Sequence, residues 1–252
     1  MDKSTYERLL IELAKKREYQ KLLDLANEVV AEYPDWHIAW HYQGTAYGLQ
    51  ENHEKAITSF IKALEIKPNS EKALYGLSVS FHALKMYAEA IACLLKHQEI
   101  SGKEFKLSFA LGVNYSECNE IEKAIEAFSS ALKIRPESEE ALFCLADCYR
   151  IQEKYDKAIE FYLKALEVNP QNVMVNHNTA VCYKLLNDNE HAIEYYQKTL
   201  KLDPAFLHSL RNLADIYIEL GQQKDAMELI QQALKIKPDS DDLQVLAEKI
   251  KN

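Results

Sequence analysis

The chain has 252 residues, of which 48% are hydrophobic and 27% charged, proportions typical of a folded protein and unlike those of a disordered chain. The net charge is −9 and no basic stripe is present, which argues against nucleic-acid binding. No apolar run is long enough to cross a bilayer and no signal-peptide stretch opens the chain, so we expect no membrane insertion and a cytoplasmic location.

Helix breakers recur along the chain at a fixed interval. The six prolines are Pro34, Pro68, Pro136, Pro170, Pro204 and Pro238, and Gly102 fills the one missing place. A proline cannot donate to a helix ladder and restricts the residue before it, so each proline ends a helix. The 34-residue interval therefore predicts a tandem repeat array.

Rows of 34 residues that begin at Lys3 align small and large side chains in fixed columns. Column 8 reads Leu10, Gly44, Ser78, Gly112, Ala146, Ala180 and Ala214, and column 20 reads Leu22, Ala56, Ala90, Ala124, Ala158, Ala192 and Ala226. Column 11 reads Leu13, Tyr47, Phe81, Tyr115, Tyr149, Tyr183 and Tyr217, and column 24 reads Ala26, Phe60, Leu94, Phe128, Tyr162, Tyr196 and Ile230. Small residues let two helices approach closely while rings fill the space between them. Each row predicts two antiparallel helices with a turn near columns 15–17.

Small residues in columns 8, 20 and 27, aromatic residues in columns 11 and 24, and proline in column 32 resemble the tetratricopeptide repeat. The resemblance implies an all-α fold, a right-handed α-solenoid superhelix of antiparallel helix pairs. It implies seven tandem repeats, at residues 3–36, 37–70, 71–104, 105–138, 139–172, 173–206 and 207–240. We expect residues 241–252 to form a C-terminal capping helix, with Leu243, Leu246, Ala247 and Ile250 on one face.

Two local features of the sequence concern the starts of helices and the third repeat. Ser70, Ser138 and Ser240 each precede an acidic residue, a pattern that favours an N-cap followed by a first turn complementary to the helix dipole. The third repeat departs from the pattern, because His97 stands in a column that mostly holds alanine and Gly102 replaces proline. We expect looser packing between the third and fourth repeats.

The resemblance implies that the first helix of each repeat lines a concave groove, through columns 2, 5, 6, 9, 12 and 13. The apolar residues expected there are Tyr42, Tyr75, Val79, Phe109, Val113, Phe143 and Val181. Exposed apolar surface often marks a binding site. The alternative is that these side chains pack against the neighbouring first helix and belong to the core, which helical spacing alone does not decide.

Polar residues of the later repeats occupy the same columns. Asn178 and Asn212 share column 6, where a carboxamide can both donate to and accept from a peptide backbone. The alternative is that both are solvated surface residues. Asp147 and Asp215 would favour a basic residue on the ligand, while Arg211 weakens that field. The family's clamp for the C-terminal carboxylate of heat-shock chaperones is not predicted: Lys72 and Lys106 match its column 2, but the companion residues are missing.

No pattern in the chain predicts catalysis, a cofactor or a metal. His37 and His41 have zinc-ligand spacing without a third ligand, and Cys144, Cys148 and Cys182 are interpreted as buried small side chains. No phosphate-binding glycine loop or activated nucleophile is recognisable. We therefore expect a non-enzymatic interaction scaffold that binds a peptide segment of a partner protein in its concave groove. A self-associating assembly protein, which would form a homo-oligomer, is the alternative, and a regulatory module of an enzyme complex is a third.

Overall fold

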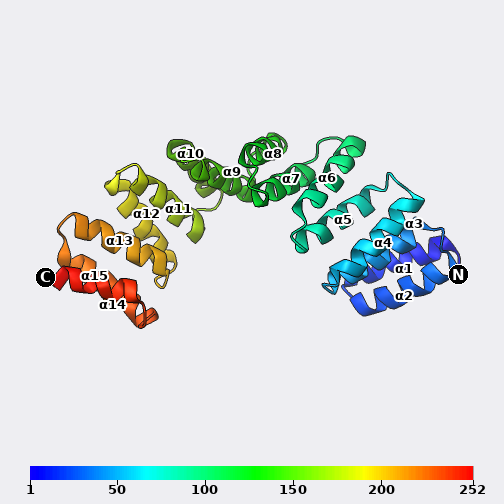
Figure 1. Cartoon of the computed structure of the whole chain (residues 1–252), viewed down its shortest axis with the longest axis horizontal. Coiled ribbons are helices and arrows are strands. Elements are labelled where there is room, and N and C mark those ends of the chain that lie inside the picture. Colours follow the sequence, from blue (N-terminus) through cyan, green and yellow to red (C-terminus); the bar gives the residue numbers. More distant parts are fainter. Residues whose placement is uncertain (252) are drawn as a thin grey trace. The chain divides into compact units, whose positions relative to one another are not determined.

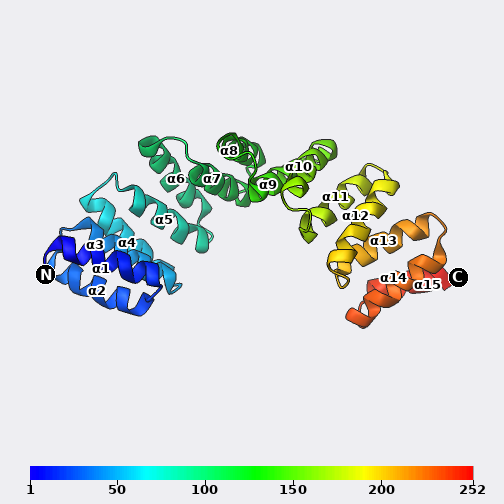
Figure 2. The ribbon, with the colours of Figure 1, turned by 180° about the vertical axis from the view of Figure 1, so that it is seen from behind.

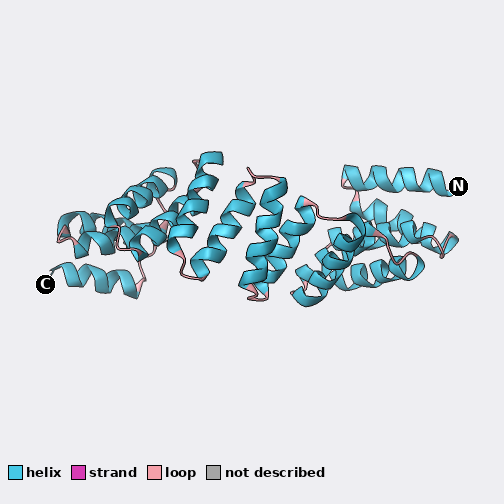
Figure 3. Cartoon of the chain, turned by 90° about the horizontal axis from the view of Figure 1, so that it is seen from above, coloured by secondary structure: helices cyan, strands magenta, loops and turns pink. Residues whose placement is uncertain are grey.

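A computed structural model describes residues 1–251, except for the side chains of Lys249 and Lys251. Helices and connecting loops make up this part of the chain, and no strand occurs in it (Figures 1 and 3). The helices of the first four repeats are α1 (Lys3–Lys16), α2 (Tyr19–Glu32), α3 (His37–Leu49), α4 (His53–Ile66), α5 (Glu71–Ala83), α6 (Tyr87–Ser101), α7 (Phe105–Glu117) and α8 (Ile121–Ile134). They are followed by α9 (Glu139–Ile151), α10 (Tyr155–Val168), α11 (Val173–Leu185), α12 (Asn189–Leu202), α13 (Leu207–Glu219), α14 (Gln223–Ile236) and α15 (Asp241–Lys251).

Within a repeat, a ring from the second helix packs against a small residue of the first. The Phe128 ring of α8 reaches within 2.6 Å of the place that a Cβ of Gly112 in α7 would occupy. Phe128 is buried, as are Ala124 and Ala131 one turn away on the same face of α8. The small and aromatic columns of the sequence thus fix the close approach of two helices, and the all-α solenoid of helix pairs is confirmed.

A left-handed residue connects the two helices of every repeat. Column 15 has positive φ throughout, at Arg17, Glu51, Lys85, Asn119, Glu153, Asn187 and Gly221. The next residue then bonds back to the end of the first helix, as when the Asn52 amide donates to the carbonyl of Tyr47 over 2.9 Å. This is the usual hydrogen-bonded end of an α-helix. It falls where the sequence predicts the turn.

The predicted N-caps are only partly found. Ser138 Oγ accepts a hydrogen bond of 3.3 Å from the amide of Ala141, which confirms this cap. Ser70 stands at the predicted N-cap position of α5, with Glu71 in the first turn, but its side chain makes no capping hydrogen bond.

The chain divides into two compact units, unit 1 ending at Ile134 and unit 2 beginning at Arg135. In unit 1, Ile91 and Leu94 of α6 pack with Leu107 and Leu111 of α7 in a buried cluster. This cluster spans the junction between the third and fourth repeats, where the sequence predicts looser packing. The looseness stays a prediction, to be measured by hydrogen exchange.

Each end of the array carries its own packing. In α1, the Tyr6 hydroxyl donates to Glu32 over 2.6 Å. This bond ties α1 to the end of α2, the helix beside it (Figure 2). Leu243 of α15 is buried with Leu210 and Ala233 of the seventh repeat. The apolar face of α15 therefore covers α13 and α14, and only residue 252 of the expected capping segment lies outside the described residues.

Candidate functional site

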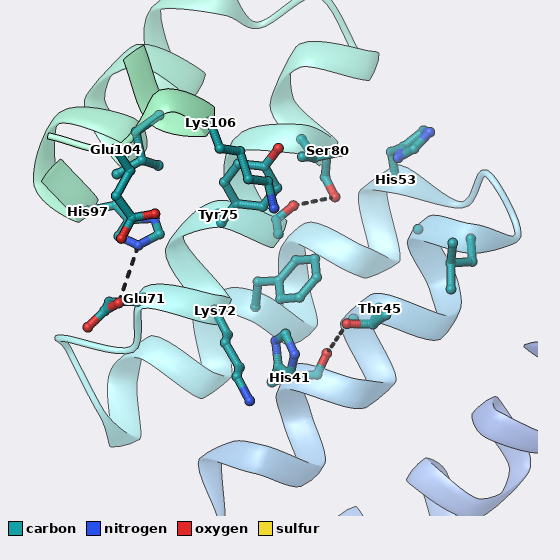
Figure 4. Close-up of a pocket in the computed structure, with 17 residues that line it drawn as sticks. His41, Thr45, His53, Glu71, Lys72, Tyr75, Ser80, His97, Glu104 and Lys106 are labelled. Carbon is teal, nitrogen blue, oxygen red and sulfur yellow. Dashed lines mark hydrogen bonds and ion pairs between the residues drawn. The ribbon is translucent and has the colours of Figure 1, made fainter. Parts of the chain in front are cut away.

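A hollow of about 510 Å³ opens on the first helices of three consecutive repeats of unit 1 (Figure 4). It is lined by α3, α5 and the start of α7, with the Phe60 ring of α4 beneath. Its volume lies in the range of small-ligand pockets. Two residues expected in the groove, Tyr75 and Val79, line it, and 47% of Val79 is exposed.

Glycines in α3 and α5 make this hollow possible. A Cβ on Gly76 would lie 2.4 Å from the Phe60 ring and one on Gly44 would lie 2.9 Å from it, so the ring occupies the space of both absent side chains. A Cβ on Gly48 would meet nothing closer than 3.8 Å. Phe60 thus forms an apolar floor, and Gly48 leaves further room above α4.

Lysines and an aromatic ring form one margin of the hollow. Lys106 Nζ lies 3.4 Å from the centroid of the Tyr75 ring, a close cation–π contact (Figure 4). Burial lowers the pKa of Lys106 and raises that of Tyr75, because both groups are partly removed from water. Lys72 extends beside His41. Its charge, after burial, is the second cause that lowers the pKa of His41 to about 4.

Histidines with unused ring nitrogens line the same hollow. His97, 8% exposed, places its Nε2 3.6 Å from the carboxylate of Glu71. The buried Nδ1 atoms of His41, His53 and His97 have no hydrogen-bond partner in the described part of the chain. Buried polar atoms usually have such partners, so these nitrogens are unsatisfied within the protein alone.

A second hollow of about 210 Å³ lies between α5 and α7. Tyr75, Val79, Phe109 and Val113 line it together. The Phe109 ring is tilted against Phe128 with centroids 5.7 Å apart, so its inner face packs on the core while its outer face stays partly exposed. The structure therefore brings four of the expected apolar residues together between α5 and α7 of unit 1.

Tyr42 does not belong to that open face. Only 8% of it is exposed, and it packs with Leu10, Leu22 and Ala46 in a buried cluster. The first repeat covers this ring, because α1 and α2 lie over the start of the array and fill the space with leucines. Tyr42 therefore belongs to the core, and the prediction that it lines the groove is wrong.

The polar residues expected in unit 2 are largely engaged with one another. Asp147 Oδ1 accepts from the Tyr162 hydroxyl at 2.5 Å, from Arg150 Nε at 2.9 Å and from Asn178 Nδ2 at 3.3 Å. Phe143 lies beside this cluster, its ring tilted against Tyr162 with centroids 6.0 Å apart. Asp147 thus joins α9, α10 and α11, and its carboxylate is satisfied within the protein.

The polar residues expected in the groove of the seventh repeat make fewer contacts within the protein than Asp147 does. Asn212 Nδ2 donates to the Tyr196 hydroxyl over 3.1 Å, while Asp215 lies 4.0 Å from Lys184 Nζ. Arg211 is exposed. Val181 packs partly against the buried cluster around Tyr196. Each asparagine has committed one of its two N–H donors to the protein, so the rest of its carboxamide can still meet a ligand.

Sequence reasoning missed several residues of the unit 1 hollow, among them Gly48, His53, Phe60, Gly76, His97 and Glu104. Of these residues, only His97 carried a signal in the sequence, because it departs from the pattern of its column in the third repeat. Elsewhere, burial raises the pKa values of Cys144 and Cys182 to about 12, which keeps both thiols protonated at neutral pH. No three metal-ligating side chains gather among residues whose side chains the structure describes.

The paired helices and the hollowed first-helix face define an α-solenoid repeat protein. Sequence models of the tetratricopeptide repeat match residues 37–70 and 139–172, 105–138, 161–194 and 185–250. The chain belongs to the tetratricopeptide repeat family. This fold typically serves as a non-catalytic scaffold for protein interactions.

Solved structures share the fold at low sequence identity. The C-terminal part of a tetratricopeptide repeat-containing protein from Cytophaga hutchinsonii has a TM-score of 0.83 and 14% identity, with 95% of this chain and 98% of that one covered. Pseudomonas aeruginosa pilF has a TM-score of 0.70 and 17% identity, with 84% and 96% covered. YrrB, a tetratricopeptide repeat protein with an unusual peptide-binding site, has a TM-score of 0.66 and 20% identity, with 73% and 95% covered.

Two further searches gave no match. No curated protein matches the chain. Among the helices that the structure describes, none combines the length and apolar character that crossing a bilayer requires.

Proposed function

We propose that this protein is a non-enzymatic scaffold whose unit 1 binds an extended segment of a partner protein on the face formed by α3, α5 and α7. The observation that carries the proposal is the pair of adjoining hollows with an exposed apolar wall between them. Val79 and Tyr75 line both hollows, so a segment lying on this face would meet apolar surface in each. Burial of that surface supplies affinity, because apolar area removed from water contributes about 25 cal/mol per Å².

The α11 and α13 face of unit 2 is proposed as a polar contact surface. The remaining hydrogen-bonding groups of Asn178 and Asn212 can bind a peptide backbone, with Arg211 and Asp215 beside them. Asp147 and Phe143 act at this surface by holding Asn178 and Tyr162 in place. The fold shared with YrrB, a tetratricopeptide repeat protein with an unusual peptide-binding site, supports peptide binding as the mode of recognition.

Selection of random peptides displayed on phage, against the immobilised whole chain, tests this function. Val79→Glu places a charge between the two hollows at an exposed position, so it should abolish capture without unfolding the chain. Ile61→Glu is the matched control, because Ile61 is a similarly exposed aliphatic residue of unit 1 that lines neither hollow. Equal recovery of peptides by both variants and the native chain would refute the site.

Self-association is the competing function. Sedimentation velocity over a wide range of protein concentrations separates the two, because a scaffold that only binds peptides stays monomeric. Concentration-dependent assembly that Val79→Glu leaves intact would favour the self-assembling alternative.

A further inference from the structure

The larger hollow of unit 1 has two chemically different margins (Figure 4). Glu71 and Glu104 gather around His97 on one side, whereas Lys106 lies over Tyr75 and Lys72 reaches toward His41 on the other. The largely buried Phe60 ring, packed against Gly44 and Gly76, forms the apolar floor of the hollow. A ligand in this hollow therefore meets apolar surface and charge together.

The lysine margin is the unpaired one. Neither Lys72 nor Lys106 has a carboxylate within ion-pair distance among residues with described side chains, and Glu104 acts on Lys106 only as a more distant charge. Glu71, in contrast, already faces His97 at 3.6 Å. The ammonium group of Lys106 is partly removed from water, so it gains more from a counter-charge than a fully solvated one does. This margin therefore favours a ligand anion.

The orphan histidine nitrogens favour the same kind of ligand. His41 and His97 both line the hollow with buried, unbonded Nδ1 atoms. A neutral imidazole can carry its proton on Nδ1 and donate it to an oxygen acceptor. A carboxylate or a peptide carbonyl entering beside Lys72 would satisfy His41, and a peptide carbonyl could satisfy His97.

We propose that this hollow accepts one large apolar side chain of a partner segment together with an acidic side chain next to it, Lys72 and Lys106 supplying the counter-charge. The inference rests on the proposed peptide-binding function and adds the chemical class of the segment. The apolar side chain packs on Val79 above the floor of the hollow, and the carboxylate lies on the side that carries Lys72 and Lys106. It needs no chain terminus, so it differs from capture of a free C-terminal carboxylate.

The experiment uses the whole chain and the random peptide library described above. Enriched sequences should carry Asp or Glu within two residues of a large apolar residue. The variant Lys72→Glu with Lys106→Glu should lose these sequences. The control variant Lys55→Glu with Lys67→Glu changes the net charge by the same amount. Neither residue lines the hollow, so this variant should still bind the enriched sequences.

Synthetic copies of the enriched peptides, with blocked termini, then measure the charge contribution by fluorescence polarisation. Exchange of the peptide's Glu for Gln should weaken binding to the native chain about three- to tenfold, as expected for one or two exposed ion pairs. The same exchange should change binding to the Lys72→Glu, Lys106→Glu variant by less than about twofold.

Each other outcome overturns the inference in a distinguishable way. Peptides that depend on Val79 but show no preference for acidic residues would leave the proposed function standing and refute the charge requirement. Enrichment of basic residues would do the same. Recovery of no peptide that depends on Val79 would overturn both the proposed function and the inference.

Discussion

Gly76→Ala adds a single methyl group at the floor of the unit 1 hollow and should destabilise that unit. The new Cβ would lie 2.4 Å from Cζ and 2.6 Å from Cε1 of Phe60. The ring cannot retreat freely, because it already packs against the backbone of Gly44, where a Cβ would lie 2.9 Å from Cδ1 and Cε1, and only 3% of Phe60 is exposed. Either the ring or α5 must move.

Two opposing effects set the magnitude. Alanine stabilises a helix interior by about 1 kcal/mol relative to glycine. Overpacking a dense core by one methyl group costs about 1–3 kcal/mol. The net expectation is a loss of up to about 2 kcal/mol for Gly76→Ala. Gly48→Ala should instead gain about 0.5–1 kcal/mol, because its Cβ meets only ordinary contacts at 3.8 and 3.9 Å.

Urea unfolding followed by tryptophan fluorescence measures both changes. The chain's two tryptophans, Trp36 and Trp40, lie in unit 1, and Trp40 packs against the cluster that contains Phe60. Adding Phe60→Leu to Gly76→Ala should cost less than the sum of the two single changes, because the clashing ring atoms are gone. Equal stabilisation by Gly76→Ala and Gly48→Ala would refute the packing argument.

The other predictions concern unit 2 and one helix cap, each measured by hydrogen exchange of the affected helices. Asp147→Asn should cost about 1–3 kcal/mol, since it leaves hydrogen-bonded partners without their carboxylate, whereas Asp215→Asn should cost less than about 0.5 kcal/mol. Ser138→Ala should cost about 1 kcal/mol, and more than Ser70→Ala, which removes no capping bond. Burial lowers the pKa of His177 from 6.5 to about 4. Between these two values, unfolded His177 takes up a proton that the folded form excludes. The free energy of unfolding should therefore fall by up to about 3 kcal/mol as the pH drops from 6.5 to about 4. His177→Asn should flatten this dependence.

The helix pairs were predictable because their cause is local and repeated. A proline or glycine ends each repeat, and a small residue faces a ring at fixed spacing, as Gly112 faces Phe128. These features act between helices that are neighbours in the sequence. The hollow was not predictable in this way, because Gly76 of the third repeat faces Phe60 of the second.

The same distinction explains the polar residues of unit 2. Column 24 holds Phe60 and Phe128 in unit 1 but Tyr162 and Tyr196 in unit 2. The two tyrosine hydroxyls bond to Asp147 and to Asn212, which are groove-facing residues in the sequence pattern. The change from phenylalanine to tyrosine within column 24 was the visible signal that a hydroxyl is present. Which residue that hydroxyl bonds depends on how far the ring reaches between the helices, which the column does not specify.

Tyr42 shows the limit of column arguments. It shares column 6 with Gly76 and Asn212, yet it is buried where they are partly exposed. A column specifies the direction of a side chain relative to its own helix, whereas burial depends on what the neighbouring repeat supplies. The leucines of the first repeat, Leu10 and Leu22, were the departure from pattern that accompanies this difference.

Several of the turns between paired helices hold a non-glycine residue at positive φ, and replacing it should increase the free energy of unfolding. Of the column 15 residues, Arg17, Glu51, Lys85 and Glu153 are ordinary L-residues held at φ values near 60°. Such a conformation costs roughly 1 kcal/mol relative to glycine, which adopts it without steric penalty. Because the four sites are far apart along the chain, their gains should add. Four glycines could therefore raise the thermal tolerance of the protein without altering either hollow, which would provide a robust background for every binding variant.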